Sequence, residues 1–195
     1  IMQTADALFL DCFQVYLRQI ERELDLSASH DSGRSHAVQN STYSKRIDAI
    51  NYSILCDDGQ GSKHLDNADV ILIGVSRCGK TPTCLFLALQ YGIRAANYPL
   101  IPEDFQKRSL PDTLKNHRHK LFGLTILPDR LHRIRQERRP DSEYASIENC
   151  KYEVRCAEEL IGRAKVPLID TTTRSIEEVA TVIRQRPTGK KSAIT

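Results

Sequence analysis

Hydrophobic positions have a helical spacing up to residue 68, and beyond it they form short runs that alternate with helical segments. In the first part, apolar residues recur every three or four positions over 5–24 and over 43–55, which predicts two packed amphipathic helices. The polar stretch 27–42 between them is typical of a loop. From residue 69 onward short apolar runs alternate with helical segments, so we expect a mostly parallel sheet flanked by helices.

The alternating part of the chain divides into short strands and longer helices. The strands are expected at 70–73, 93–98, 120–127 and 166–170, and the helices at 83–91, 110–119, 128–139, 144–164 and 176–184. Ser175 and Glu178 have the spacing of a capping box at the start of the last helix. We therefore expect a helical and loop segment at 1–68, an α/β domain at 69–184 and a disordered tail at 185–195.

The turn between the first strand and its helix carries the strongest chemical signal. Its residues, Gly74, Val75, Ser76, Arg77, Cys78, Gly79, Lys80 and Thr81, match the phosphate-loop pattern G-x-x-x-x-G-K-S/T. Amides of the turn and of the helix N-terminus would bind phosphate oxygens, Lys80 would reach the outermost phosphates, and the Thr81 hydroxyl would ligate Mg²⁺. A chance match in an ordinary strand–turn–helix is the alternative. The strand before the motif and the helix after it favour a nucleotide-binding P-loop domain, similar in fold to P-loop kinases.

Several carboxylates are candidates for a catalytic or metal-binding role beside this loop. Asp57 and Asp58 precede it, and as a pair they can hold Mg²⁺, accept a proton from a hydroxyl, or simply form a turn before Gly59. The spacing does not decide among these readings. Asp170 ends the last predicted strand, where ligands of a parallel sheet bind, and is a further acidic candidate near the loop. Asp104 lies at a predicted helix start, where an acid suits the helix dipole.

The predicted helix at 128–139 is unusually basic. It contains Arg130, Arg133, Arg135, Arg138 and Arg139. Arginines that close over a phosphate site neutralise charge during phosphoryl transfer. A solvated basic face is the interpretation that we favour for each arginine taken singly.

Composition narrows the class of protein. With 40% hydrophobic and 27% charged residues, the 195-residue chain has the balance of a globular protein with a core. The formal net charge of +3 is too small to indicate a nucleic-acid partner. No apolar run approaches the ~20 residues of a membrane span and no signal peptide leads the chain, so we expect no membrane partner.

The cysteines and the first residue add two expectations. Six cysteines without a C-x-x-C pair or a metal-binding spacing are expected to be reduced thiols, which favours a cytoplasmic protein. Cys78, inside the phosphate loop, is interpreted as a small filler residue rather than an oxidation-sensitive one. The chain begins with Ile1 instead of methionine, and we expect a fragment whose N-terminal part is missing.

Several segments together resemble a known family. They are GVSRCGKTPTCLFLALQYGIRAANYPL, the upstream YSKRIDAINYSILCDDG, the GLTI strand with its arginine helix, and the closing VPLIDTTTRSIEEVA. The chain resembles the phosphoenolpyruvate synthase regulatory proteins, a family that also includes the regulator of pyruvate, phosphate dikinase. The resemblance covers about residues 24–184. The motif RCGKTPTC is more similar to the synthase-directed branch of the family than to the dikinase-directed branch.

The resemblance implies a bifunctional enzyme. Members phosphorylate a threonine of the target, which inactivates it, with ADP as donor; they also remove that phosphate with inorganic phosphate and release pyrophosphate. Carried over by position, the segment 74–81 would bind ADP, and Asp57 or Asp58 would orient the threonine or accept its proton. The family usually has histidine where this chain has Cys56, and it has an N-terminal portion that this chain lacks.

Other functions stay open at this point. The same chemistry directed at pyruvate, phosphate dikinase, a kinase for a small metabolite, and an inactive fragment that only binds nucleotide are the alternatives. A GTPase switch is disfavoured because the chain has no N-K-x-D guanine-reading motif. The sequence leaves a homo-oligomer undecided.

Overall fold

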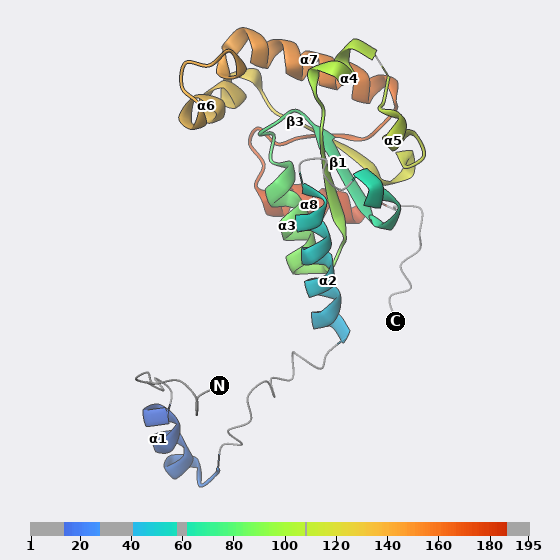
Figure 1. Cartoon of the computed structure of the whole chain (residues 1–195). Helices are drawn as coiled ribbons and strands as arrows, with labels where there is room; N and C mark the ends of the chain where they lie inside the picture. Colours follow the sequence, from blue (N-terminus) through green and yellow to red (C-terminus); the bar gives the residue numbers. More distant parts are fainter. Residues whose placement is uncertain (1–13, 28–40, 58–61, 108, 187–195) are drawn as a thin grey trace, which may run out of the picture. The chain divides into compact units, whose positions relative to one another are not determined.

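The computed structural model describes residues 14–27, 41–57, 62–107 and 109–186, drawn as ribbon in Figure 1. The chain divides into two compact units, Ile1–Val38 and Gln39–Thr195. The first unit contains α1 (Gln14–Leu24), the described part of the helix predicted at 5–24. Its apolar side chains Tyr16, Ile20 and Leu24 are exposed, where the sequence analysis expected a packed helix.

The second unit begins with α2 (Ser41–Leu55) and a 3₁₀ segment, η2 (Ser62–Asn67). The helix predicted at 43–55 is confirmed, but its buried face is not the expected one. Ala49 and Ser53 are buried, whereas Ile47 and Ile54 are exposed. Because α2 packs against α3 and β2, small side chains at the contact let the backbones approach closely. The domain boundaries proposed from the sequence remain predictions.

The sheet is formed by parallel strands, as predicted. The described strands are β1 (Val70–Gly74), β2 (Ala95–Pro99), β3 (Leu121–Thr125) and β4 (Leu168–Asp170), in the order β2-β1-β3-β4. In register, Gly74 pairs with Pro99 and Ile73 pairs with Gly123, so the carboxyl ends of β1, β2 and β3 lie at one edge. Every residue of β1 is buried, as expected for a strand covered on both faces.

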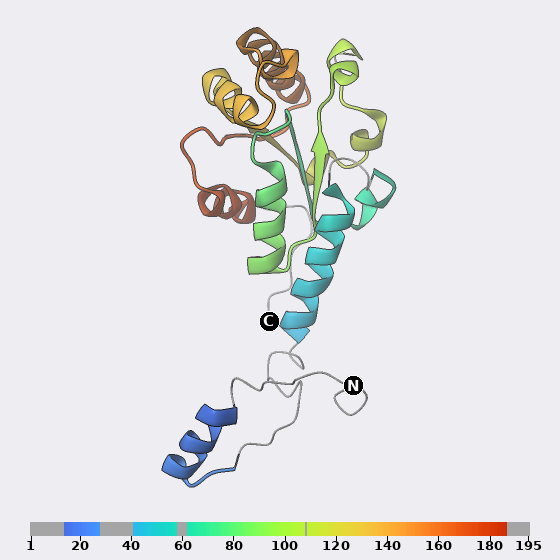
Figure 2. The same cartoon turned by 60° about the vertical axis from the view of Figure 1, so that its left-hand side comes forward.

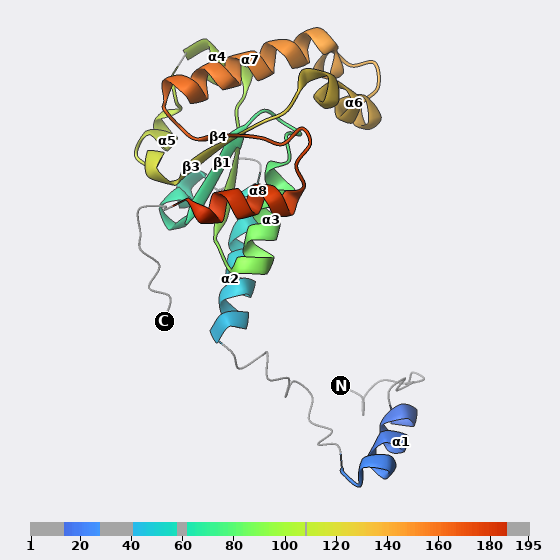
Figure 3. The ribbon, with the colours of Figure 1, turned by 180° about the vertical axis from the view of Figure 1, so that it is seen from behind.

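Helices cover both faces of this sheet. They are α3 (Lys80–Tyr91), α4 (Pro102–Lys107), α5 (Asp112–Lys115), α6 (Pro128–Arg138), α7 (Ile147–Arg163) and α8 (Ile176–Gln185), with 3₁₀ turns η3 (Arg118–Lys120) and η4 (Glu143–Ala145). Figures 1 and 3 show α4 and α7 on one side and α2, α3 and α8 on the other. This arrangement confirms the predicted α/β class, similar to P-loop kinases.

Local sequence signals account for several helix ends. The capping box at α8 is present, because Ser175 and Glu178 each accept a hydrogen bond from the other's backbone amide. Gly92, in the left-handed conformation, ends α3. The helix predicted at 110–119 divides into the short α5 and η3. None of the described helices is long and apolar enough to cross a bilayer.

The topology fixes where a ligand can bind. The connection after β1 runs through α3 on one face, whereas the connection after β3 runs through α6 and α7 on the other, an arrangement visible in Figure 2. Adjacent strands whose connections leave on opposite faces form a crevice at their carboxyl ends. The predicted phosphate loop follows β1 at this crevice.

Candidate phosphate-binding site

The backbone between β1 and α3 has a conformation that its glycines make accessible. Gly74 has φ +153°, and a Cβ atom added there would lie 2.3 Å from the Leu124 carbonyl oxygen. Gly79, immediately before α3, has φ +92°, and Arg77 has φ +73°. Residues other than glycine rarely adopt such angles, so the turn depends on glycine at positions 74 and 79, while Arg77 is a non-glycine residue that adopts the left-handed conformation.

Lys80 begins α3 and is held across the turn. Its side chain is buried, and Nζ donates a hydrogen bond of 2.7 Å to the carbonyl oxygen of Val75. The ammonium group therefore lies beside the N-terminus of α3, where the helix dipole is positive. A pocket of about 430 Å³ opens here, lined by Asp57, Ser76, Arg77, Gly79, Lys80, Thr81, Pro82, Asn97 and Arg138. The basic residues Arg77, Lys80 and Arg138 outnumber the one acidic residue, Asp57, in this pocket, and the N-terminus of α3 lies there. Both features suit an anionic ligand.

Three polar side chains from different elements meet at one wall of this pocket. The Thr81 hydroxyl donates to Asp57 Oδ1 at 2.9 Å. Asn97 Nδ2 donates to the same carboxylate oxygen at 2.6 Å and to Thr81 Oγ1 at 3.0 Å. The structure thus brings together Asp57 and Thr81, which the sequence analysis selected separately. Asp58 lies outside the described residues.

Asn97 is the member of this group that sequence reasoning missed. It is buried in β2, and its backbone amide donates to the Cys56 carbonyl oxygen at 3.1 Å, which ties the end of α2 to the sheet. The available signal was a polar residue near the carboxyl end of an otherwise apolar strand. The apolar residues of the strand predict the strand itself but not the partners of this amide, which come from other elements.

The oxygen atoms of this group fit Mg²⁺. Among the described residues, no cluster of three or more His, Cys, Asp or Glu side chains could hold a metal alone. Mg²⁺, however, prefers oxygen ligands and is commonly bound by one or two protein oxygens together with phosphates of the substrate. The Thr81 hydroxyl and the Asp57 carboxylate are such oxygens, hydrogen-bonded to each other beside the phosphate loop.

The loop is supported from behind by a buried arginine. Arg135, on α6, is fully buried; its Nη2 donates to Glu153 Oε2 at 2.6 Å and to the Ser76 carbonyl oxygen at 3.2 Å. Its guanidinium lies 4.1 Å from the centre of the Tyr144 ring, and the Tyr144 hydroxyl is 2.9 Å from Ser76 Oγ. A solvated basic face is therefore wrong for Arg135, which holds Ser76 in place. Arg138, by contrast, is exposed and lines the pocket.

Comparison with known proteins agrees with this geometry. The model of the kinase/pyrophosphorylase family matches residues 1–183. The chain belongs to this family. It is 54% identical over 185 residues to a protein of Bordetella avium, covering 94% of this chain and 68% of that protein. A protein of Azoarcus sp. is 54% identical over 186 residues, covering 94% and 67% of the two chains, and one of Burkholderia vietnamiensis is 53% identical over 186 residues, covering 95% and 69%.

All three relatives carry the name "Putative phosphoenolpyruvate synthase regulatory protein". Membership of a kinase/pyrophosphorylase family indicates phosphoryl-group transfer in general. A glycine-dependent turn with a buried lysine lies next to an aspartate–threonine pair in one pocket. Such transfer requires groups that suit phosphate and groups that suit Mg²⁺ close together, and this arrangement has both.

In this kinase/pyrophosphorylase chain, Cys78 is a structural residue of the loop. The side chain is 1% exposed, and burial raises the pKa of its thiol, an effect that the nearby Lys80 only partly offsets. A buried thiol with a raised pKa is a poor nucleophile. These observations support the interpretation of Cys78 as a filler residue.

The other acidic candidates are engaged elsewhere. Asp170 Oδ1 accepts a hydrogen bond of 2.8 Å from the Thr172 amide, and Asp170 lines a separate cavity with Glu158. Its neighbour Thr171 does reach the loop, since its hydroxyl donates to the Cys78 carbonyl oxygen at 3.1 Å. Asp104 accepts from the Ile101 amide at the start of α4, and burial raises its pKa. The structure therefore does not bring Asp170 or Asp104 to Asp57 and Thr81.

Proposed function

We propose that the protein is a serine/threonine kinase and phosphorylase that regulates phosphoenolpyruvate synthase. ADP would be the phosphoryl donor for a threonine of the synthase, which inactivates it, and inorganic phosphate would remove the group again as pyrophosphate. The observation that carries the proposal is the pocket in which Lys80 and the hydrogen-bonded Asp57 and Thr81 lie together. The names of the relatives and the resemblance of the loop sequence support the choice of target.

Both reactions move one phosphoryl group between two oxygens. In the kinase direction, the bond from the β-phosphorus of ADP to its bridging oxygen breaks, AMP leaves with the electron pair, and a bond to the threonine oxygen forms. The hydroxyl proton passes to a base. In the other direction an oxygen of inorganic phosphate attacks the phosphothreonine phosphorus, pyrophosphate forms, and the threonine oxygen takes a proton.

Several residues of the pocket have a role in this scheme. Lys80 and the amides of 74–81 bind the phosphates and stabilise the charge that moves during transfer. Thr81 and Asp57 would hold Mg²⁺, which would neutralise further phosphate charge when bound. Asn97 keeps the carboxylate and the hydroxyl in place through its two hydrogen bonds. Asp57 or Asp58 orients the target threonine or accepts its proton.

The test follows phosphate on the synthase in both directions. Purified chain is incubated with ADP and unphosphorylated synthase, or with inorganic phosphate and phosphorylated synthase, and phosphothreonine is measured by mass spectrometry. We expect Lys80→Ala to lower both rates by about 100-fold or more, because one group serves both transfers. Lys115→Ala, an exposed lysine that pairs with Asp112 on α5, is the control and should change neither rate.

The competing functions give different results in the same assay. Phosphoryl transfer to pyruvate, phosphate dikinase but not to the synthase would identify the dikinase as the target. Transfer from ATP to a small acceptor would indicate a metabolite kinase. ADP binding without transfer to either protein would indicate an inactive nucleotide-binding chain. Full activity of Lys80→Ala in both directions would contradict the proposed site.

A further inference from the structure

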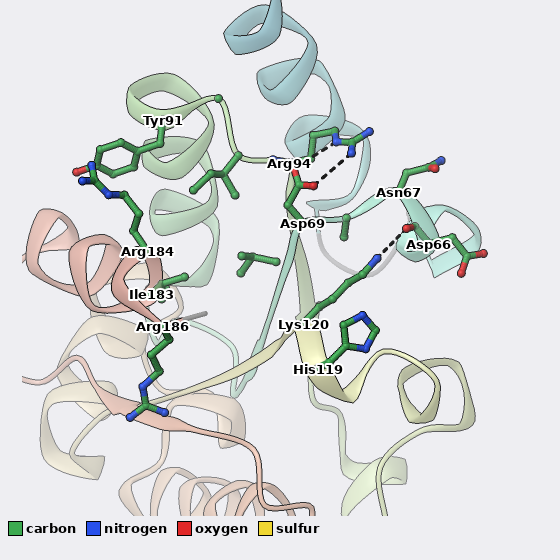
Figure 4. Close-up of a pocket in the computed structure, with 14 residues that line it drawn as sticks. Asp66, Asn67, Asp69, Tyr91, Arg94, His119, Lys120, Ile183, Arg184 and Arg186 are labelled. Atoms are coloured by element: carbon green, nitrogen blue, oxygen red, sulfur yellow. Dashed lines mark hydrogen bonds and ion pairs between the residues drawn. The ribbon is translucent and has the colours of Figure 1, made fainter. Parts of the chain in front are cut away.

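A second pocket lies at the opposite end of the sheet from the phosphate loop (Figure 4). It has a volume of about 390 Å³ and is formed where β1 begins and where α3 and α8 end. The two pockets have no lining residue in common. Lys80 and Tyr91 are at opposite ends of α3, so at 1.5 Å per residue the helix separates them by about 17 Å. This pocket is therefore distinct from the proposed transfer site.

Positive charge dominates the rim of this second pocket. Four cationic side chains line it, Arg94, Lys120, Arg184 and Arg186, against two carboxylates, Asp66 and Asp69. Asp69 is already occupied, because it accepts hydrogen bonds from Arg94 Nε at 3.3 Å, from Arg94 Nη2 at 3.2 Å and from the Arg94 amide at 3.0 Å. Because Arg94 and Asp69 neutralise each other, the positive charge that remains unpaired with Asp69 includes Arg184 and Arg186, near the end of α8.

Arg184, in the last turn of α8, and Arg186, which follows the helix, have donors available. Within the described part of the chain, neither Arg184 nor Arg186 forms an ion pair with a carboxylate. The Arg184 guanidinium lies 4.8 Å from the centre of the Tyr91 ring. Figure 4 shows the Arg184 and Tyr91 side chains next to each other. A guanidinium that stacks by its face keeps the N–H donors along its edge, and these match carboxylate and phosphate oxygens.

The helix dipole explains only part of this arrangement. A cation in the last turn of a helix is favoured by the dipole, and this accounts for one arginine at the end of α8. It does not account for a concave surface in which further cations come from the ends of other elements. Lys120, which precedes β3 and donates to the Asp66 carbonyl oxygen at 2.8 Å, and Arg94, which precedes β2, also lie on this rim.

Aliphatic and aromatic side chains line the pocket between these charges. Val70, Ile93 and Ile183 contribute apolar surface, and Tyr91 adds an aromatic ring. Ligand sites combine such apolar walls with a few polar groups that fix orientation. Figure 4 shows the Arg184 side chain directed toward Tyr91 and the Arg186 side chain directed away from it, so the two guanidinium groups offer separate anchors. We propose that this pocket binds a small organic anion, with an apolar body against Ile93 and Tyr91 and a phosphate or carboxylate group on one of these two arginines. The proposal does not depend on the proposed function of the phosphate loop.

Calorimetric titration with defined probes tests this proposal. Phenyl phosphate and benzoate carry an aromatic body with either anionic group, while inorganic phosphate and benzyl alcohol each lack one of the two features. We expect at least one aromatic anion to bind with a Kd below about 1 mM. In Lys80→Ala, which removes the proposed phosphate site as a competitor, this anion should bind about tenfold or more tighter than inorganic phosphate and benzyl alcohol. The stronger of the two aromatic anions identifies the preferred charged group.

Variants decide where the probe binds. Arg184→Ala/Arg186→Ala should weaken binding about tenfold or more, because both charged donors are lost. Arg130→Ala/Arg133→Ala, which removes two exposed arginines from α6, and Lys80→Ala should each leave the affinity within about twofold, because those residues lie outside the pocket. Circular dichroism checks that each variant is folded. If the double variant fails to fold, Arg184→Ala and Arg186→Ala are measured singly, and at least one of them should lose about threefold or more in affinity.

Three results would overturn the proposal. One is the absence of saturable binding by either aromatic anion. Another is binding that Lys80→Ala abolishes while Arg184→Ala/Arg186→Ala (or both single variants, if the double variant does not fold) leaves it unchanged, which would place the probe at the phosphate loop. The third is equal affinity for inorganic phosphate in Lys80→Ala, where the phosphate loop no longer competes, which would show that the apolar walls contribute nothing.

Discussion

Asn97 connects residues that are distant in sequence but adjacent at the proposed transfer site. Its side-chain amide donates to Asp57 and to Thr81, and its backbone amide donates to Cys56. The turn 74–81 could be selected as a candidate phosphate loop from sequence because its residues form one contiguous motif. Asn97 could not, because its role depends on the pairing of β2 with β1, which places residue 97 next to the loop.

Asn97→Ala should raise the Mg²⁺ concentration needed for nucleotide binding. Without the amide, the Asp57 carboxylate and the Thr81 hydroxyl are no longer held in one orientation, and we expect the half-saturating Mg²⁺ concentration to rise about tenfold. Titrating Mg²⁺ at fixed ADP and following binding by calorimetry measures this. Asn51→Ala, an exposed asparagine on α2, is the control. Equal Mg²⁺ dependence of Asn97→Ala and wild type would show that the amide does not position the metal ligands.

Gly74→Ala should destabilise the fold strongly. The added Cβ would meet the Leu124 carbonyl oxygen at 2.3 Å, and φ of +153° is unfavourable for alanine. We expect a loss of about 2 kcal/mol or more in the free energy of unfolding, measured with urea. Gly162→Ala is the matched control, since nothing lies within 4 Å of its Cβ position in helix α7, and it should stabilise by about 0.5–1 kcal/mol. Similar effects of the two substitutions would contradict this explanation.

At the scale of elements, periodicity located most helices and strands but did not predict what they bury. α2 formed where its spacing predicted, yet it turns Ala49 and Ser53 inward and leaves Ile47 and Ile54 exposed. Close packing against α3 and β2 favours small side chains there, and that contact is not visible in the helix alone. Arg135 was misjudged for the same reason, since Glu153 and Ser76, which satisfy it, belong to other elements.

Arg135→Met should destabilise the protein because it leaves the partly buried Glu153 without its cation. Removing one partner of a buried ion pair costs about 3–5 kcal/mol, and we expect a loss of that size in urea unfolding. Arg133→Met, exposed on the same helix, should change stability by less than about 0.5 kcal/mol. Adding Glu153→Gln to Arg135→Met should recover part of the loss. No recovery in the double variant would show that Arg135 acts mainly through Ser76 and Tyr144.

At the scale of the molecule, the parallel sheet brings the separate signals to one edge. Alternating apolar runs predicted the α/β class, which the structure confirms. The phosphate-loop motif predicts at which edge of the sheet a ligand would bind, and this remains a prediction. The sequence could not predict which acidic candidate lies beside the phosphate loop. Asp57 precedes β1 and Asp170 ends β4, and either position could have placed a carboxylate there. Only the three-dimensional contacts distinguish Asp57, which reaches Thr81, from Asp170, which faces Thr172.

The most direct test of the central claim is a crystal structure of the chain with ADP and Mg²⁺. We expect the β-phosphate within the turn 74–81, contacted by Lys80, with the metal on Thr81 Oγ1 and close to Asp57. ADP bound elsewhere, with this turn empty, would contradict the assignment of the phosphate loop as the transfer site.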